Sequence, residues 1–103
     1  MLTLTTFEVP GKEIEPLGLV KGNVVQAKHI GRDLMAGLKN LAGGEIKGYT
    51  ELLTESRQIA YDRLLAEAEA LGADAVVGLR FSSSQVMEGA CEIIAYGTAV
   101  KFI

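Results

Sequence analysis

Alternating polar and apolar residues open the chain, which is the pattern of β-strands. Residues 2–6 read Leu-Thr-Leu-Thr-Thr, a short run of strand-forming residues. A Pro-Gly pair at 10–11 ends this run. Residues 17–28 form a second extended region, in which the Gly-Asn pair at 22–23 marks either a bulge or a turn between two half-strands. The first quarter of the chain therefore predicts two strands.

The hydrophobic period changes to that of a helix over residues 30–41, where apolar residues recur at steps of four, four and three. Two glycines at 43–44 predict the end of this helix. A longer helix is predicted over 50–71, with Thr50 as its N-cap and Gly72 as the residue that follows its C-terminus. The predicted apolar stripe of this helix is Leu53, Ile59 or Ala60, Leu64, Ala68 and Leu71.

Strand patterns return after the long helix. Residues 75–83 alternate as a strand, the polar run 82–89 predicts a hairpin connection, and residues 92–102 predict the last strand. Small residues on one face of this last strand would permit the close approach of another backbone or subunit. That face carries Ile93, Ala95, Gly97 and Ala99, and the other carries Ile94, Tyr96, Thr98, Val100 and Phe102.

This order of elements predicts an α+β fold. Residues 1–103 would form a single domain, a two-layer β-β-α-α-β-β subunit with a mostly antiparallel sheet. Two helices would cover one face of that sheet. We expect the other face, with its small and apolar residues, to be covered by association between subunits.

Composition supports one well-packed domain that associates with copies of itself. A chain of 103 residues and 11.0 kDa buries about 65% of its surface on folding. Apolar residues make up 49% and charged residues 22%, which excludes a disordered chain. The mean hydropathy of +0.25 is high for so small a chain, and favours a surface hidden by a partner copy. The net charge of −3 argues against a nucleic-acid partner.

The distribution of apolar residues also argues against a membrane location. The beginning of the chain lacks the basic region and the long apolar core of a secretory signal. The longest uncharged apolar runs, at 75–79 and 93–100, are far shorter than the about 20 residues of a membrane-spanning helix. We therefore expect a cytoplasmic protein with no membrane partner.

Four segments together resemble a known bacterial family. They are Gly-Gly-Glu at 43–45 with Tyr49 behind it, Arg-Gln-Ile-Ala at 57–60, Leu-Gly-Ala-Asp-Ala-Val-Val-Gly at 71–78, and Tyr-Gly-Thr-Ala-Val at 96–100. This pattern, spread over residues 17–101, resembles the YbjQ-like family, also called the uncharacterised UPF0145 family or the "putative heavy-metal-binding" domain. The resemblance implies a compact α+β subunit that assembles into a ring-shaped homopentamer. It implies no established biochemical function.

The family label directs attention to ligands for soft metals, which are thiolate, thioether and imidazole groups. Cys91 and Met87 are four residues apart around the predicted hairpin loop, so they could converge, with Glu88 or Glu92 beside them. One chain supplies too few such ligands for a closed site, whereas a ring could gather Cys91 from several subunits. The ordinary alternative is that Cys91 is a small apolar residue at a strand start. His29 is interpreted as a helix-entry or interface residue.

A second group of candidates surrounds the long helix. Arg57 faces neither Glu51 nor Glu55 squarely on a helix, so its partner would be Glu45, Tyr49 or a carboxylate of a neighbouring subunit. A planar, bidentate guanidinium is suited to such an interface. The same groups could hold a small anionic ligand in a cleft between subunits, and we favour the interface interpretation.

No catalytic arrangement is apparent in the sequence. Its only histidine is far from the serines at 82–84, and no nucleophile motif accompanies them, so we do not expect an enzyme. The sequence predicts a homo-oligomeric, pentameric binding module that holds a heavy metal ion or small ligand at its subunit interfaces. The alternative is a structural or protein-interaction ring without ligand chemistry.

Overall fold

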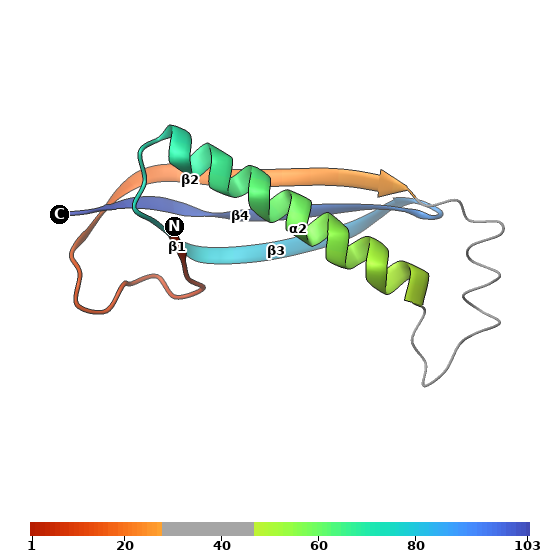
Figure 1. The fold of residues 1–103 in the computed structure, drawn as a ribbon, viewed down its shortest axis with the longest axis horizontal. Helices are drawn as coiled ribbons and strands as arrows, with labels where there is room; N and C mark the ends of the chain where they lie inside the picture. Colours follow the sequence, from red (N-terminus) through yellow and green to blue (C-terminus); the bar gives the residue numbers. More distant parts are fainter. Residues whose placement is uncertain (28–46) are drawn as a thin grey trace.

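One helix lies against a four-stranded sheet in the computed structural model, which describes residues 1–27 and 47–103 (Figure 1). The strand order is β1-β3-β4-β2, with β1 parallel to β3 and the other pairs antiparallel. The predicted α+β class and mostly antiparallel sheet are confirmed, whereas the predicted helix at 30–41 lies outside the described residues. The elements are β1 (Leu2–Thr3), β2 (Ile14–Ala27), α2 (Lys47–Ala70), β3 (Ala75–Met87) and β4 (Ala90–Phe102).

The edge strands differ from the prediction in length and regularity. β1 is shorter than the predicted 2–6, although the N–H of Leu4 still donates to the carbonyl of Val76. β2 pairs with β4 without interruption through residues 22–23, and its irregularity lies between Pro16 and Gly18 instead. The predicted bulge or turn at 22–23 is therefore wrong. The glycine there serves a contact with the helix.

The β3–β4 hairpin is longer than the sequence suggests. β3 continues through the serine run to Met87 and β4 begins at Ala90, so only Glu88 and Gly89 connect them. The predicted hairpin connection at 82–89 is wrong. This part of β3 is exposed on both faces, so its sequence lacks the alternation of apolar and polar residues that indicates a strand. All residues at 81–88 are exposed. The hairpin thus forms an arm that extends beyond the core.

α2 packs on the sheet face that carries the small side chains of β4. Ala95 and Ala99 are fully buried in the same cluster as Ala60 and Leu64 of the helix. A methyl group on Gly22 of β2 would collide with the carbonyl oxygen of Ala60 and the backbone nitrogen of Leu64. The small-residue face is therefore covered by the chain's own helix. Our expectation that it would be the free, associating face is wrong.

The buried stripe of α2 recurs every four residues. The predicted members Leu53 and Ile59 are only half-buried, and Leu71 is exposed. α2 begins at Lys47, so Thr50 lies within its first turn and is not its N-cap. Gly72 has a φ of 75° just after the helix, as predicted. The buried positions are Leu52, Ser56, Ala60, Leu64 and Ala68.

The sheet face opposite α2 is covered only at the end near the termini. The segment after β1 returns across this end, where Val9 is buried with Ala75, Val77 and Val100. Further along the same face the side chains of the strands are exposed or half-buried. One end of the outer face is thus a second small core, and the rest is uncovered.

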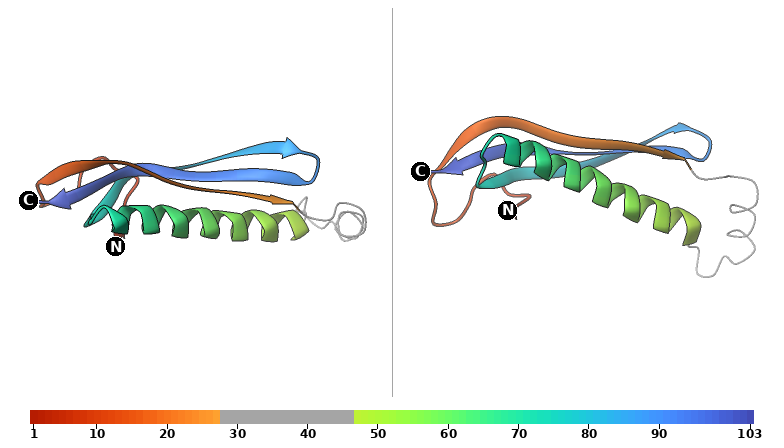
Figure 2. Two further views of the ribbon diagram at one scale, coloured as in Figure 1. Left: turned by 90° about the horizontal axis from the view of Figure 1, so that it is seen from above. Right: turned by 45° about the horizontal axis from the view of Figure 1, so that its top comes forward.

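The molecule is elongated, with extents of 54 × 25 × 17 Å (Figure 2). Its radius of gyration is 17.0 Å, whereas a compact domain of this length has about 13 Å. Its accessible surface is 6693 Å², against about 5,600 Å² for a typical monomer of this mass. No helix among the described residues is long and apolar enough to cross a bilayer.

Asp74 ties the turn after α2 to β4. Its carboxylate accepts a hydrogen bond from the backbone N–H of Phe102 at 2.8 Å and lies 3.9 Å from the ammonium of Lys101. The N–H of Asp74 donates in turn to the carbonyl of Val100 at 2.9 Å. The Gly-Ala-Asp-Ala segment therefore sets where β3 enters the sheet.

We predict that Gly22→Ala lowers the free energy of unfolding by about 3 kcal/mol, because α2 must move away from β2 to admit the methyl group. Urea unfolding at one fixed protein concentration measures the change. Asn23→Ala is the matched control, since the Asn23 side chain is exposed. Equal stability of the two variants would contradict the close contact.

We predict that Asp74→Ala costs about 1–2 kcal/mol of unfolding free energy, because it leaves the N–H of Phe102 without its acceptor. Asp74→Asn keeps a side-chain oxygen and should recover most of the loss. Thermal unfolding of both variants at neutral pH distinguishes them. A loss of the same size in Asp74→Asn would instead assign the effect to the charge.

Candidate functional site

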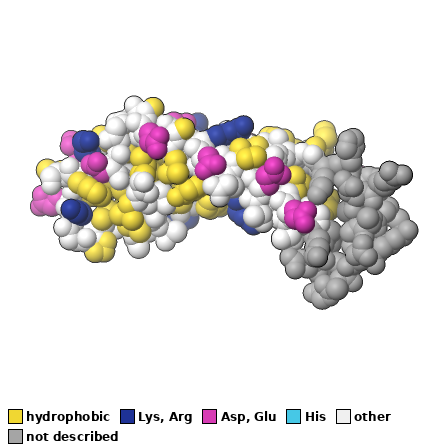
Figure 3. Space-filling model, in the orientation of Figure 1, with side chains coloured by type: hydrophobic (Ala, Val, Ile, Leu, Met, Phe, Trp, Pro, Cys, Tyr) yellow, Lys and Arg dark blue, Asp and Glu magenta, His cyan; other side chains and the backbone are white. Residues whose placement is uncertain are grey.

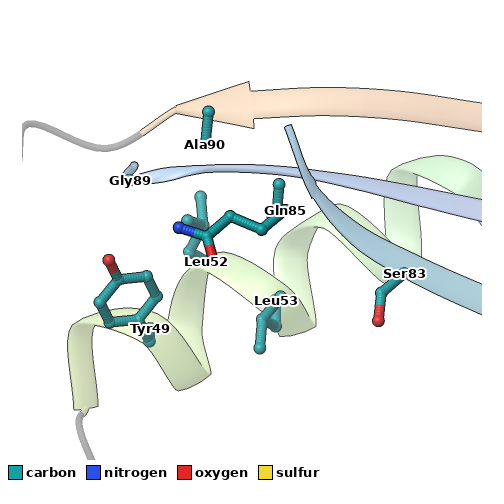
Figure 4. A pocket seen from close by; sticks show the side chains of 8 residues that line it. Tyr49, Leu52, Leu53, Ser83, Gln85, Gly89 and Ala90 are labelled. Atoms are coloured by element: carbon teal, nitrogen blue, oxygen red, sulfur yellow. The ribbon is translucent and has the colours of Figure 1, made fainter. Parts of the chain in front are cut away.

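A cavity of about 320 Å³ opens between the first half of α2 and the far part of the β3–β4 hairpin (Figure 4). Figure 2 shows the reason: the hairpin turns away from the helix at the end opposite the termini. Ligand sites in proteins occupy about 300–1,000 Å³, so this volume suits a small ligand. The lining residues are Tyr49, Leu52, Leu53, Ser83, Gln85, Gly89, Ala90 and Cys91.

Strand register and helix spacing bring these residues together. Gln85 pairs with Cys91 across the hairpin, so both side chains lie on the face toward α2. Tyr49 lies three and four residues before Leu52 and Leu53, which places all three on one side of the helix. The side chain of Gln85 extends toward Tyr49 (Figure 4). The result is a largely apolar wall with a few polar groups.

Cys91 is the soft-metal candidate that lies in this cavity. It is a free, half-buried cysteine. Met87 pairs with Ala90, beyond an irregularity of the register between Gln85 and Met87. Met87 is also 66% exposed and does not line the cavity. The hairpin therefore does not direct these two sulfur-bearing side chains into one site within a chain.

The proposed interface group is separated in the structure. Tyr49 lines the cavity, whereas the exposed Arg57 donates to Thr54 Oγ1 at 3.4 Å. Glu45 and His29 lie outside the described residues. The structure thus places Tyr49 and Cys91 on the wall of one cavity, which the sequence did not indicate.

A metal ion at this site needs ligands beyond those of one described chain. Within residues 1–27 and 47–103, no three His, Cys, Asp or Glu side chains lie close enough together to hold an ion. The donors in the cavity are one thiol, a phenol, a hydroxyl and an amide. This set fits a soft ion only if further ligands come from another copy or from the ion's own complex.

Ser56 is a functional position that the sequence pattern did not single out. It is fully buried, and its hydroxyl oxygen lies 2.6 Å from Gln26 Oε1 and 2.7 Å from the carbonyl oxygen of Leu52, two acceptors that share its single proton. These bonds hold the first half of α2 beside β2. Ser56 fits the four-residue spacing of the buried stripe. The spacing would have indicated Ser56 if polar residues had been counted in the stripe.

A second cavity of about 450 Å³ lies on the other side of Leu52, between α2 and the end of β2. Its lining includes Gln26 and the carboxylates Glu51 and Glu55, both exposed. Acidic side chains continue along the outward side of the helix (Figure 3). This row is the solvated face of α2.

The sequence is similar to known proteins over almost its whole length. The family model described as "Putative heavy-metal-binding" matches residues 1–103. UPF0145 proteins of Colwellia psychrerythraea and Thermotoga maritima are each 64% identical over 98% of this chain, and cover 97% and 96% of their own lengths. A UPF0145 protein of Vibrio parahaemolyticus is 59% identical over 100% of this chain and 99% of its own.

A solved structure shows the same fold at low sequence identity. A protein of unknown function from Pediococcus pentosaceus superimposes with a TM-score of 0.71 at 17% identity, covering 100% of this chain and 98% of its own. The match over the whole chain and the identities of 59–64% to these relatives agree with the segments identified in the sequence. The chain belongs to the uncharacterised UPF0145, or YbjQ-like, family.

Proposed function

We propose that the protein is a homo-oligomeric binding module that holds a heavy metal ion or a small ligand at the cavity beside Cys91. The placement of the Cys91 thiol on the wall of this cavity is the observation that carries the proposal. A thiol that is only a packing residue has no need of an open space of about 320 Å³ in front of it. The description of the matching family model supports the same chemistry.

The lining favours a soft, thiol-seeking ligand. Thiolate sulfur selects soft cations over hard ones such as magnesium or calcium. The remaining wall is mainly apolar, with Tyr49, Ser83 and Gln85 as its polar groups. Binding sites of this kind use a few polar groups for orientation and apolar surface for affinity.

Self-association would supply the missing ligands. Each chain has one cysteine, so a complete set of soft ligands requires several copies or an ion that brings its own. The accessible surface of 6693 Å² is larger than that of a typical monomer of this mass, about 5,600 Å², which agrees with a subunit that buries surface by association. The ring, and its pentameric form, come from the family resemblance.

The module binds and does not catalyse, and it acts in the cytoplasm. The cytoplasm keeps thiols reduced, so Cys91 would remain available for a ligand there. Among the described residues that line the cavity, the polar groups are a phenol, a hydroxyl, an amide and a thiol, a set suited to holding a ligand.

We predict that Cys91→Ser abolishes the uptake of Cd²⁺ in equilibrium dialysis, because a hydroxyl is a poor ligand for a soft cation. Ser83→Ala is the matched control: it changes the same cavity and keeps the thiol. Native mass spectrometry of each protein reads the number of copies and the bound metal together.

Equal uptake by Cys91→Ser and the wild type would remove the thiol from the binding site. Assembly without any uptake of metal would support the alternative function, a structural or protein-interaction ring.

A further inference from the structure

We propose that the tip of the β3–β4 hairpin of one copy packs on the outer sheet face of a second copy. The hairpin tip is Val86, Met87 and Glu88, and the outer sheet face is the uncovered surface opposite α2. The inference rests on the self-association in the proposed function and names the two surfaces that meet. The exposed residues that define the outer sheet face are Leu19, Lys21, Val25 and Tyr96.

The outer sheet face carries large apolar side chains that no other part of residues 1–27 and 47–103 covers. Leu19 is 66% exposed and Val25 is 56% exposed, although both lie within a paired strand. Lys21 pairs with Tyr96 between them, and the exposed Asn23 and the half-buried Glu92, which pairs with Val25, lie on the same face. The surface over β2 and β4 is therefore apolar side chains with a few polar ones among them. Exposed large apolar side chains gathered on one face are typical of an interaction surface.

The hairpin tip is the complementary feature. Val86 is 51% exposed and Met87 is 66% exposed. The tip lies at the end of the molecule away from the termini (Figure 1). The exposure of these apolar side chains to water is unfavourable in free energy, and contact with another molecule would remove that cost.

Charge selects the pairing between these two surfaces. Neither the ammonium of Lys21 nor the carboxylate of Glu88 has a bonding partner within residues 1–27 and 47–103. Lys21 lies in the middle of the outer sheet face, and Glu88 is part of the hairpin tip, next to the apolar Val86 and Met87. Opposite charges at the centres of two apolar patches fix the orientation of an encounter and exclude other pairings.

The edge of β2 is a poorer alternative for a second copy. Its backbone is already bonded to α2 at mid-strand, where the N–H of Lys21 donates to Glu67 and the carbonyl of Asn23 accepts from Arg63. Glu67 and Arg63 thus already bond the backbone groups with which an added strand would have to pair. Association therefore uses the face of β2, and not its edge.

Two different surfaces on one chain lead to a head-to-tail assembly. Because the tip and the face are distinct, each copy can use both at once, and a closed set of such contacts is a ring.

A charge-reversal cycle tests the contact. The variants are Lys21→Glu, Glu88→Lys and the double variant, with Glu69→Lys as a control on the exposed side of α2. Sedimentation velocity over a range of protein concentrations gives the concentration at half-assembly. We expect each single reversal to raise this concentration about fivefold or more, and the double variant to restore the wild-type value.

The outcomes separate this inference from the proposed function. An assembled wild type whose concentration at half-assembly is unchanged in both single variants would overturn the contact and leave self-association standing. A double variant weaker than either single variant would overturn it too. A wild type that stays monomeric would overturn both. Met87→Ser adds an uncharged check, because it should weaken assembly without affecting the Lys21–Glu88 pair.

Discussion

The close contact between α2 and β2 at Gly22 determines the rest of the architecture. Because this glycine has no side chain, the helix backbone at Ala60 and Leu64 lies directly against the strand. Ser56 then holds the first half of α2 to β2 through Gln26. The β3–β4 hairpin turns away from the helix at this end (Figure 2). The cavity beside Cys91 is the space that this divergence leaves.

The same divergence explains the exposed surfaces. A helix that follows β2 leaves the far half of the hairpin without a covering layer. The short segment after β1 covers only the end of the outer face near Val9. The described part of the chain therefore leaves two surfaces exposed: the hairpin tip, which carries Glu88, and the outer sheet face, which carries Lys21. Assembly would cover both, and would bring additional ligands within reach of the cavity.

The candidate site was partly predictable from residue chemistry. Cys91 and Tyr49 were both identified in the sequence, one as a metal ligand and the other as an interface residue. Their shared cavity was not, because it depends on the angle between a helix and a hairpin that are far apart in the sequence. Met87 was grouped with Cys91 on spacing alone. In the structure Cys91 lines the cavity, whereas Met87 is exposed at the end of β3 and does not.

Local patterns were sufficient for the class of fold, the four strands, the long helix and its end at Gly72, since these depend on periodicity and backbone preference near each residue. Local patterns could not tell which face of β4 the helix covers, because both faces are apolar. Only packing decides that question: Gly22, Ala95 and Ala99 admit a helix backbone, and the larger side chains of the other face do not. Likewise, a serine run in a strand looks like a loop until its partner strand is known.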